Sequence, residues 1–128
     1  MAVLGSPEWL AEPHDPAAPG LVAAGVAIAV QYVVPGGPDG EVRFGTRVAA
    51  DGAVDELSGD VDDPDVTLTI THPEFVAIVR GEVSPNVSFM RGRTKVAGHT
   101  GQMLRLLQAS QGDAYEAARA ELAGRTSD

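Results

Sequence analysis

The chain has 128 residues, no cysteine and a formal net charge of −9. This length favours a single domain over residues 1–128, and the lack of cysteine excludes disulfides, thiolate metal sites and cysteine nucleophiles. The acidic balance disfavours nucleic-acid binding, which needs clustered Lys and Arg, and it predicts at most transient contact with anionic membranes.

No segment has the apolar length that crosses a bilayer. Residues 1–13 carry Glu8 and Glu12 but no basic residue, so they do not have the pattern of a signal peptide, and we expect a cytoplasmic protein. Arg outnumbers Lys eight to one, and Ala, Gly, Pro and Asp are abundant, a composition that suggests a bacterial source.

Two features predict the structure of the first 20 residues. Ser6 followed by Pro7 is typical of a helix N-cap and first turn, which predicts a short helix over residues 7–11. Three prolines predict a loop over residues 12–20, because proline lacks the amide donor that a helix needs. We therefore expect residues 1–20 to form a short helix and a loop.

Three segments in the next part of the chain predict strands. Residues 22–34 form a near-continuous run of Val, Ile and Ala that stops at Pro-Gly-Gly-Pro, and β-branched residues favour a strand. Residues 41–49 alternate between apolar and polar side chains, which predicts a strand with one wet face. The Gly- and Pro-rich connection predicts a hairpin, and residues 53–58 are a candidate third strand.

The second half of the chain changes between strand and helix patterns. Residues 66–71 read Val-Thr-Leu-Thr-Ile-Thr, a half-buried strand. Thr71 and Glu74 have the spacing of a capping box for a helix that ends at Gly81. The remaining predicted elements are a helix over 84–90, a strand over 93–97, a helix over 100–110, and a C-terminal helix and tail over 113–128. This order indicates an α+β fold, with a mostly antiparallel sheet covered on one face by helices.

The segment from Asp65 to Gln108 resembles the sterol carrier protein type 2 family. The similarity combines the alternating strand, a capped helix with a Phe, a Phe-Met-X-Gly segment and a Lys-Val-X-Gly strand before an amphipathic helix. The matching positions are Asp65, Val66, Leu68, Phe75, Gly81, Pro85, Phe89, Met90, Gly92, Lys95, Val96, Gly98 and Met103. The resemblance implies a five-stranded sheet covered by helices, with an apolar tunnel between them that binds sterols, fatty acids or fatty acyl-CoA.

Two positions depart from that family. The family begins with a long helix, whereas only residues 7–11 are available here, so we expect one wall of the tunnel to be short or differently built. The family also has Asn or Asp after the glycine of its last strand. This chain has His99 there, and we expect Thr100 to cap the following helix instead.

The expected lining of the tunnel combines Trp9 with apolar residues of the predicted helices. The candidates are Trp9, Phe75, Ile78, Val79, Phe89, Met90, Met103, Leu104 and Leu107. Such a site needs apolar walls and few polar groups, because each buried CH₂ contributes roughly 0.8 kcal/mol. Flexible methionines can adapt to ligands of different shape. The alternative for these residues is an ordinary core, and Trp9 is either a lid over the tunnel mouth or an anchor for the N-terminus.

These features predict a protein that binds, and by extension transfers, an apolar lipid and is not an enzyme. We expect no catalytic residue, metal or cofactor, because the three histidines are far apart and the acidic residues, with exceptions such as Asp55 and Glu56, fall in turns, at helix starts or on wet faces. The Asp-rich residues 60–65 lack the Gly and terminal Glu of an EF-hand. Two alternatives stay open: a small isomerase- or cyclase-type enzyme with a buried acid or base, and a partner-binding module without a ligand.

Overall fold

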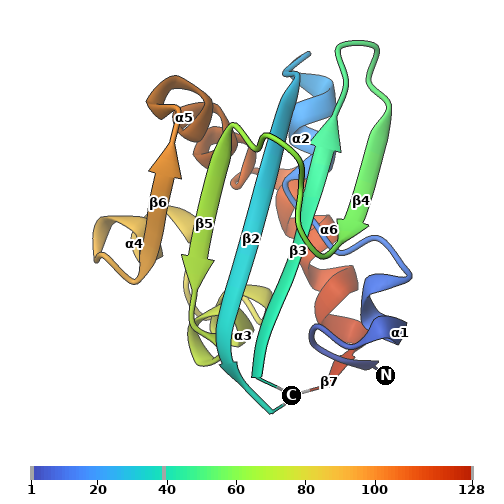
Figure 1. Cartoon of the computed structure of the whole chain (residues 1–128), viewed down its shortest axis with the longest axis vertical. Coiled ribbons are helices and arrows are strands. Elements are labelled where there is room, and N and C mark those ends of the chain that lie inside the picture. Colours follow the sequence, from blue (N-terminus) through green and yellow to red (C-terminus); the bar gives the residue numbers. More distant parts are fainter. Residues whose placement is uncertain (1, 39, 128) are drawn as a thin grey trace.

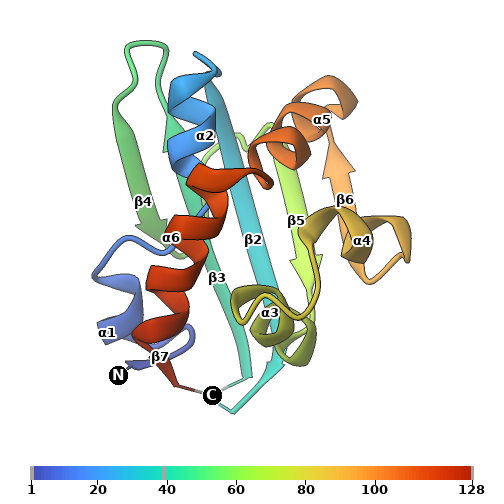
Figure 2. The same cartoon turned by 180° about the vertical axis from the view of Figure 1, so that it is seen from behind.

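The computed structural model describes residues 2–38 and 40–127. Its main feature is a five-stranded sheet with the strand order β4-β3-β2-β5-β6 (Figure 1). The helices lie on one face of this sheet, as the view from behind shows (Figure 2). The strands are β1 (Ala2–Val3), β2 (Ile28–Gly37), β3 (Gly40–Val48), β4 (Val54–Ser58), β5 (Val66–Ile70), β6 (Thr94–Gly98) and β7 (Thr126–Ser127). The helices are α1 (Pro7–Leu10), α2 (Ala18–Ala23), α3 (His72–Val79), α4 (Pro85–Met90), α5 (Thr100–Ala109) and α6 (Asp113–Gly124).

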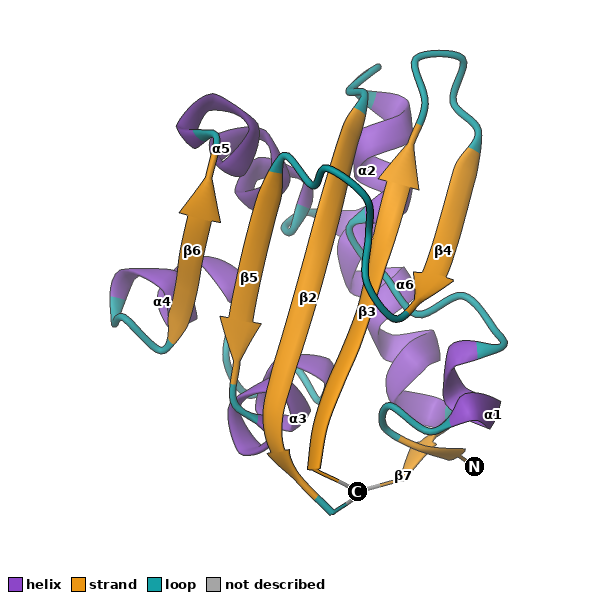
Figure 3. Ribbon diagram, in the orientation of Figure 1, coloured by secondary structure: helices purple, strands orange, loops and turns teal. Residues whose placement is uncertain are grey.

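The sheet is mixed. The pairs β2–β3, β3–β4 and β5–β6 are antiparallel, whereas β2 and β5 pair in parallel. The predicted α+β class and five-stranded sheet are confirmed, but the sheet is not purely antiparallel. The parallel pair arises because the chain leaves β4 at the sheet edge and crosses the face opposite the helices to reach β5 (Figure 3). At the start of β5, Asp65 Oδ2 accepts a hydrogen bond of 2.8 Å from the backbone N–H of Ala29 and fixes this strand against β2.

The crossing segment is held on the sheet by one side-chain amide and one glycine. Gln31 is buried on this face, where its Nε2 donates to the carbonyl oxygen of Phe44 at 3.0 Å and its Oε1 accepts from Val61 N at 2.6 Å. Val61 packs against Gly45, where an added Cβ would clash with Val61 and lie 2.5 Å from the carbonyl oxygen of Val30. Strand β2 is therefore buried on both faces, which explains its near-continuous apolar sequence.

The N-terminal segment is attached to the C-terminal one. The predicted short helix is confirmed as α1, in which Ser6 Oγ accepts a hydrogen bond of 3.2 Å from the backbone N–H of Trp9. Trp9 is fully buried, and its Nε1 donates to Thr126 Oγ1 at 2.8 Å. The guanidinium of Arg125 lies 5.7 Å from the centre of the Trp9 ring, and Ala2 pairs with Thr126 between β1 and β7. Trp9 thus anchors the N-terminus.

The structure differs from the sequence prediction before β2. Helix α2 occupies residues for which a loop and then the beginning of a strand were predicted, and β2 begins only at Ile28. Pro19 is tolerated because it lies in the first turn of α2, where its missing amide would have no partner within the helix. Leu21 is fully buried, and α2 packs against α5 and α6. The packing of α2 against α5 and α6 therefore outweighs the local sequence pattern, which predicted a loop and a strand here.

The helix starts follow the predicted positions with two changes in their caps. Ser84 Oγ accepts from Val87 N at 3.1 Å at the start of α4, whereas Thr71 makes no side-chain cap to α3. His99 caps α5 itself, because its Nδ1 accepts from Gln102 N at 3.3 Å, so the predicted role of Thr100 is wrong.

None of the helices in residues 2–38 and 40–127 combines the length and apolar character that crossing a membrane requires.

Candidate functional site

A small apolar cavity of about 60 Å³ lies between the helices and the sheet. Strands β2, β3, β5 and β6 contribute to its border from one side, and α3, α5, the start of α6 and residues 14–17 contribute from the other. The bordering residues are His14, Asp15, Pro16, Ala17, Tyr32, Phe44, Leu68, Ile70, Phe75, Ile78, Val79, Pro85, Thr94, Met103, Leu106, Leu107, Ser110 and Tyr115. Most of this border is hydrocarbon, so the cavity can accept an apolar group and offers few polar contacts.

Five of the nine predicted lining residues border this cavity, and they come from two helices. Phe75, Ile78 and Val79 lie on α3, and Met103 and Leu107 lie on α5. Ile78 and Val79 lie three and four positions after Phe75, and Leu107 lies four positions after Met103, which brings these side chains to the same face of each helix. The helical periodicity in the sequence therefore identified two of the helices that border the cavity.

The other four predicted residues lie outside the cavity border, which differs from the sequence expectation. Met90 is 81% exposed at the end of α4, and Leu104 is 58% exposed on α5, one position beyond the face that carries Met103. Phe89 is partly buried and packs against the main core. Trp9 is buried in an aromatic cluster, with its ring centre 5.5 Å from that of Phe44, and acts as the anchor described above and not as a lid.

The polar end of the cavity is built by a segment that the sequence analysis treated as a loop. Asp15 is 8% exposed, and its Oδ2 accepts hydrogen bonds from the Tyr32 hydroxyl at 3.0 Å and from Thr46 Oγ1 at 2.6 Å. Its Oδ1 accepts from the backbone N–H of Ala17 at 3.0 Å. Glu56 Oε1 on β4 accepts the backbone N–H groups of His14 and Asp15 at 2.8 and 2.6 Å. These bonds fix the proline-rich segment on the sheet.

His14 lies beside Asp15 and is almost fully buried, at 1% exposed. Its ring centre lies 5.2 Å from those of both Trp9 and Phe44. Nδ1 lies 3.0 Å from the carbonyl oxygen of Glu12, which can only accept, so Nδ1 carries the proton. Nε2 is buried and has no hydrogen-bond partner among the described residues.

The expectation that acidic residues lie only in turns, at helix starts or on wet faces is therefore wrong for Asp15, which is buried at the cavity. The one sequence signal that could have found it is Tyr32, because a phenol on the core face of a strand needs a hydrogen-bond partner.

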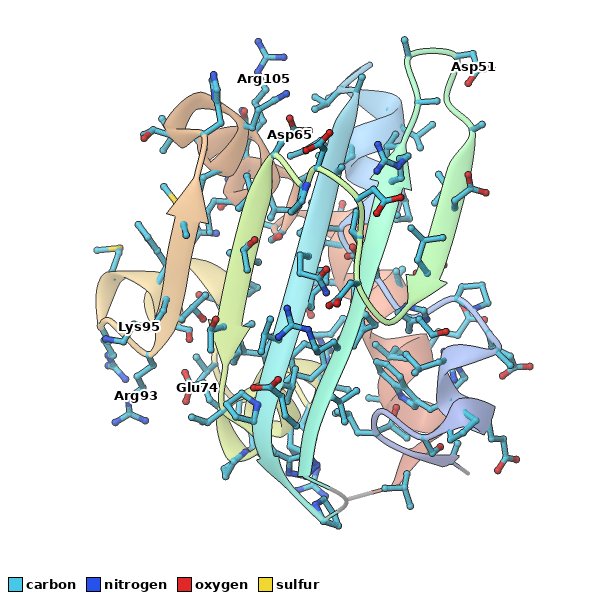
Figure 4. All side chains as sticks on the ribbon, viewed as in Figure 1. Asp51, Asp65, Glu74, Arg93, Lys95 and Arg105 are labelled. Atoms are coloured by element: carbon cyan, nitrogen blue, oxygen red, sulfur yellow. The ribbon has the colours of Figure 1, made fainter. Side chains whose placement is uncertain are left out.

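A second buried acid lies away from the cavity. Glu74 is buried in the first turn of α3, and Arg93 Nη1 lies 3.5 Å from its Oε1. Figure 4 shows Glu74 and Arg93 near the same end of the sheet, whereas Arg105 lies toward the opposite end.

Two tyrosines at the cavity have raised pKa values and stay protonated at neutral pH. Burial raises the pKa of the Tyr32 phenol well above its ordinary value, and the neighbouring Asp15 adds to this shift. Burial also raises the pKa of Tyr115, and the nearby Glu116 adds to this increase.

The described residues contain no group of three or more His, Asp or Glu side chains that could hold a metal ion.

A surface groove of about 770 Å³ lies outside the cavity, between α2, β4 and α6. His14, Asp15 and Pro16 border both this groove and the internal cavity. The segment 14–16 therefore forms the partition between the interior and the groove. Arg125 also borders the groove, where its guanidinium donates to the carbonyl oxygens of Trp9 and Pro13.

Comparison with known proteins identifies the family. The sequence model of the SCP-2 sterol transfer family matches residues 9–111. No curated protein matches the sequence at a significant level.

Solved structures share the fold at low sequence identity. A conserved hypothetical protein from Thermus thermophilus superposes with a TM-score of 0.65 at 15% identity, covering 94% of this chain and 90% of that one. A crystal structure of sterol carrier protein 2 gives 0.63 at 14% identity, with 91% and 98% covered. Palmitated SCP2L2 from Aedes aegypti gives 0.58 at 18% identity, with 72% and 86% covered. These likenesses show the fold, and the match over residues 9–111 shows that the chain belongs to the SCP-2 sterol transfer family.

Proposed function

We propose that this protein binds one apolar lipid between its helices and its sheet, and that it carries this lipid without chemically changing it. The observation that carries the proposal is the apolar cavity bordered by α3 and α5 in a chain of this family. The Aedes aegypti structure is described as palmitated, which supports an acyl chain as one ligand class for the fold. Sterols, fatty acids and fatty acyl-CoA are the classes that we propose to test.

The cavity has to expand for such a ligand. Its volume of about 60 Å³ is smaller than the roughly 300–1,000 Å³ of typical ligand pockets. Burial of about fifteen methylene groups contributes roughly 12 kcal/mol, which can offset the repacking of several side chains. Met103 is suited to moving aside for a ligand, because the unbranched methionine side chain changes conformation more easily than a β-branched side chain. We therefore propose a tunnel that forms as the ligand enters.

The partition formed by residues 14–16 is the proposed entry route. These residues are the boundary between the cavity and the surface groove, so their displacement would join the two spaces. The segment contains Pro16 and is held by the side-chain hydrogen bonds of Asp15 and Glu56 rather than by a helix or strand. A ligand arriving along the groove would have to break these side-chain bonds to pass.

The setting of this carrier is also part of the proposal. We place it in the cytoplasm of a bacterium, with transient contact to membranes and no binding to nucleic acid. The net charge of −9 supports weak adsorption to anionic membranes, because the protein as a whole is repelled by them.

The proposal is tested by identifying what the protein binds. Native mass spectrometry of gently purified protein should show one bound lipid per chain. A fluorescent fatty acid should then bind at micromolar concentration, and unlabelled lipid should displace it. The affinity should change little with salt, because burial and not charge drives binding. The absence of saturable binding across sterols, fatty acids and acyl-CoAs would favour the partner-binding alternative.

A further inference from the structure

A free strand edge lies beside the surface groove between α2, β4 and α6. Strand β4 ends the strand order at one side of the sheet, and among the described strands it pairs with β3 alone (Figure 1). The groove lies on the face that the helices cover, where α2 and α6 are seen beside β4 (Figure 2). Its volume of about 770 Å³ is within the roughly 300–1,000 Å³ of typical ligand pockets. The strand edge and the groove together offer a surface that a second molecule can occupy.

The backbone of β4 presents hydrogen-bonding groups along this edge. In an antiparallel pair, positions that bond to the partner strand alternate with positions that do not. At one end of the pair, Ala49 N donates to the carbonyl oxygen of Ala53 at 2.9 Å. At the other end, Gly59 N donates to the carbonyl oxygen of Arg43 at 2.8 Å. Every second residue from 53 to 59 therefore bonds to β3, and the residues between them direct their N–H and C=O groups outward. The outward-facing residues are Val54, Glu56 and Ser58.

The edge of β4 is regular enough to accept another strand. Its register against β3 is continuous, and the strand contains neither the bulge nor the proline that often protects a sheet edge. Val54 and Glu56 lie two positions apart on β4, and both border the groove. A strand added along this edge would continue the sheet and place every second side chain in the groove.

Acidic side chains surround the groove. The acidic residues at its border are Glu12, Asp15, Glu56 and Glu121. Arg125 is the one Lys or Arg among the described border residues, and its guanidinium already donates to the carbonyl oxygens of Trp9 and Pro13. Glu121 is exposed on α6 and Glu56 is half-buried on β4, so both carboxylates can be reached from solvent. The groove therefore favours a positively charged occupant.

Two exposed valines give the groove an apolar part. Val22 on α2 is 37% exposed and Val54 on β4 is 38% exposed, and both border the groove. Val22 lies near the turn between β3 and β4, since its Cγ1 would be 3.6 Å from a Cβ at Gly52. An aliphatic side chain beside these valines can bury apolar surface. The acidic side chains of β4 also oppose pairing with the β4 of a second copy, because like charges on opposite strands repel.

We propose that the edge of β4 and the groove beside it bind an extended basic segment of a partner protein by strand addition. The backbone of this segment would pair with Val54, Glu56 and Ser58. Its Lys or Arg side chains would meet Glu56 and Glu121, and an aliphatic side chain would cover Val22 and Val54. This inference goes beyond the proposed function and needs no bound lipid. Because the groove is also the proposed entry route, a docked segment would lie across that route.

The first test compares three labelled heptapeptides on the whole protein by fluorescence anisotropy. Val-Lys-Lys-Val-Lys-Lys-Val combines positive charge with β-branched residues, Gly-Lys-Lys-Gly-Lys-Lys-Gly keeps only the charge, and Val-Glu-Glu-Val-Glu-Glu-Val reverses it. The first peptide should bind saturably and at least about tenfold more tightly than the second, and the third should not bind. Equal affinities of the first two peptides, or no binding, would overturn the inference and leave the proposed lipid binding standing.

Backbone pairing is tested separately by amide hydrogen exchange, measured by NMR with and without the first peptide. Binding should slow exchange at the three outward-facing amides of β4, those of Val54, Glu56 and Ser58. The amides of Asp55 and Leu57 already face β3 and should change much less. Protection without this alternation would overturn strand addition.

Two charge reversals form a matched pair for the site. Glu121→Lys removes an exposed carboxylate at the groove and should weaken binding of the first peptide about five- to tenfold. Asp62→Lys makes the same change in net charge on the exposed crossing segment, on the opposite face of the sheet, and should change the affinity less than about twofold. Equal losses in the two folded variants would show that net charge alone attracts the peptide, which would overturn the site.

A second copy of the chain is the alternative occupant. Strand β6 at the other edge of the sheet contains Lys95, and Arg93 precedes it, so it is a basic strand of the same protein. Sedimentation velocity at increasing protein concentration should show a monomer throughout. Assembly with concentration, together with protection of the outward-facing β4 amides in the absence of peptide, would overturn the partner segment in favour of self-association.

Discussion

The Tyr32 hydroxyl donates a hydrogen bond of 3.0 Å to Asp15 Oδ2 and so connects the central strand to the proline-rich segment that closes the cavity. Both side chains are buried, and Thr46 donates to the same oxygen. This pair holds residues 14–16 on the sheet and places the Asp15 carboxyl group at the border of the cavity.

Tyr32→Phe should lower the free energy of unfolding by roughly 1–3 kcal/mol, because it removes the hydrogen bond that the buried Asp15 carboxyl group accepts from Tyr32. Urea unfolding followed by circular dichroism measures this change. Tyr115→Phe is the matched control, since Tyr115 is also buried at the cavity but its hydroxyl donates no hydrogen bond to the described residues, and its effect should stay within about 0.5 kcal/mol. Equal losses in the two variants would mean that the bond to Asp15 contributes nothing specific.

Alkaline pH should destabilise the protein through the same tyrosines. Burial raises the folded-state pKa of Tyr32 and of Tyr115 above the ordinary value of 10.0, so above about pH 10 the unfolded chain loses these protons before the folded one does. The free energy of unfolding is therefore unaffected by them below that pH and falls as the pH rises further. Unfolding at several pH values between about 8 and 11 measures the slope, which the double variant Tyr32→Phe, Tyr115→Phe should reduce. A slope that is the same in both proteins would contradict this linkage.

Met103→Arg and Leu104→Arg should behave differently, although the residues are adjacent on α5. Met103 borders the cavity and is 8% exposed, whereas Leu104 is 58% exposed. If the cavity opens into a tunnel, the arginine at position 103 can extend along it to water, so the protein should fold but lose about tenfold or more in probe affinity. Leu104→Arg should fold and bind normally.

Thermal melting and ligand titration on the same two variants separate the outcomes. An unfolded Met103→Arg protein would show that Met103 is sealed in solid core, because burying an unpaired charge costs several kcal/mol. A folded Met103→Arg protein with normal binding would mean that the ligand lies elsewhere.

Gly45→Ala should strongly destabilise the protein. The new Cβ would clash with Val61 and lie 2.5 Å from the carbonyl oxygen of Val30, so either the crossing segment or the central strand must shift. We expect a loss of at least about 1–3 kcal/mol in the free energy of unfolding. Gly124→Ala is the control, because nothing lies within 4 Å of the added Cβ at the end of α6, and it should be neutral or slightly stabilising. A Gly45→Ala protein as stable as the control would contradict the close packing of the crossing segment.

The sequence by itself determined the elements whose signals are local. The alternation Val-Thr-Leu-Thr-Ile in β5, the Ser6 cap of α1 and the spacing of Phe75, Ile78 and Val79 on α3 depend on neighbouring residues, so periodicity and capping rules find them. The resemblance over residues 65–108 added the family and the five-stranded sheet, which the match over residues 9–111 and the observed strand order confirmed.

Only the tertiary structure decided the features that depend on contacts between distant segments. The parallel pairing of β2 with β5, the formation of α2 and the burial of His14 and Asp15 against the sheet all join residues far apart in the chain. The leucine pattern of α5 does not by itself indicate which side of the helix faces the sheet. Leu104 was therefore expected at the cavity but is exposed, whereas Leu106 borders the cavity. A buried carboxylate such as Asp15 is stable only because Tyr32, Thr46 and Ala17 donate to it, and folding alone brings these donors together.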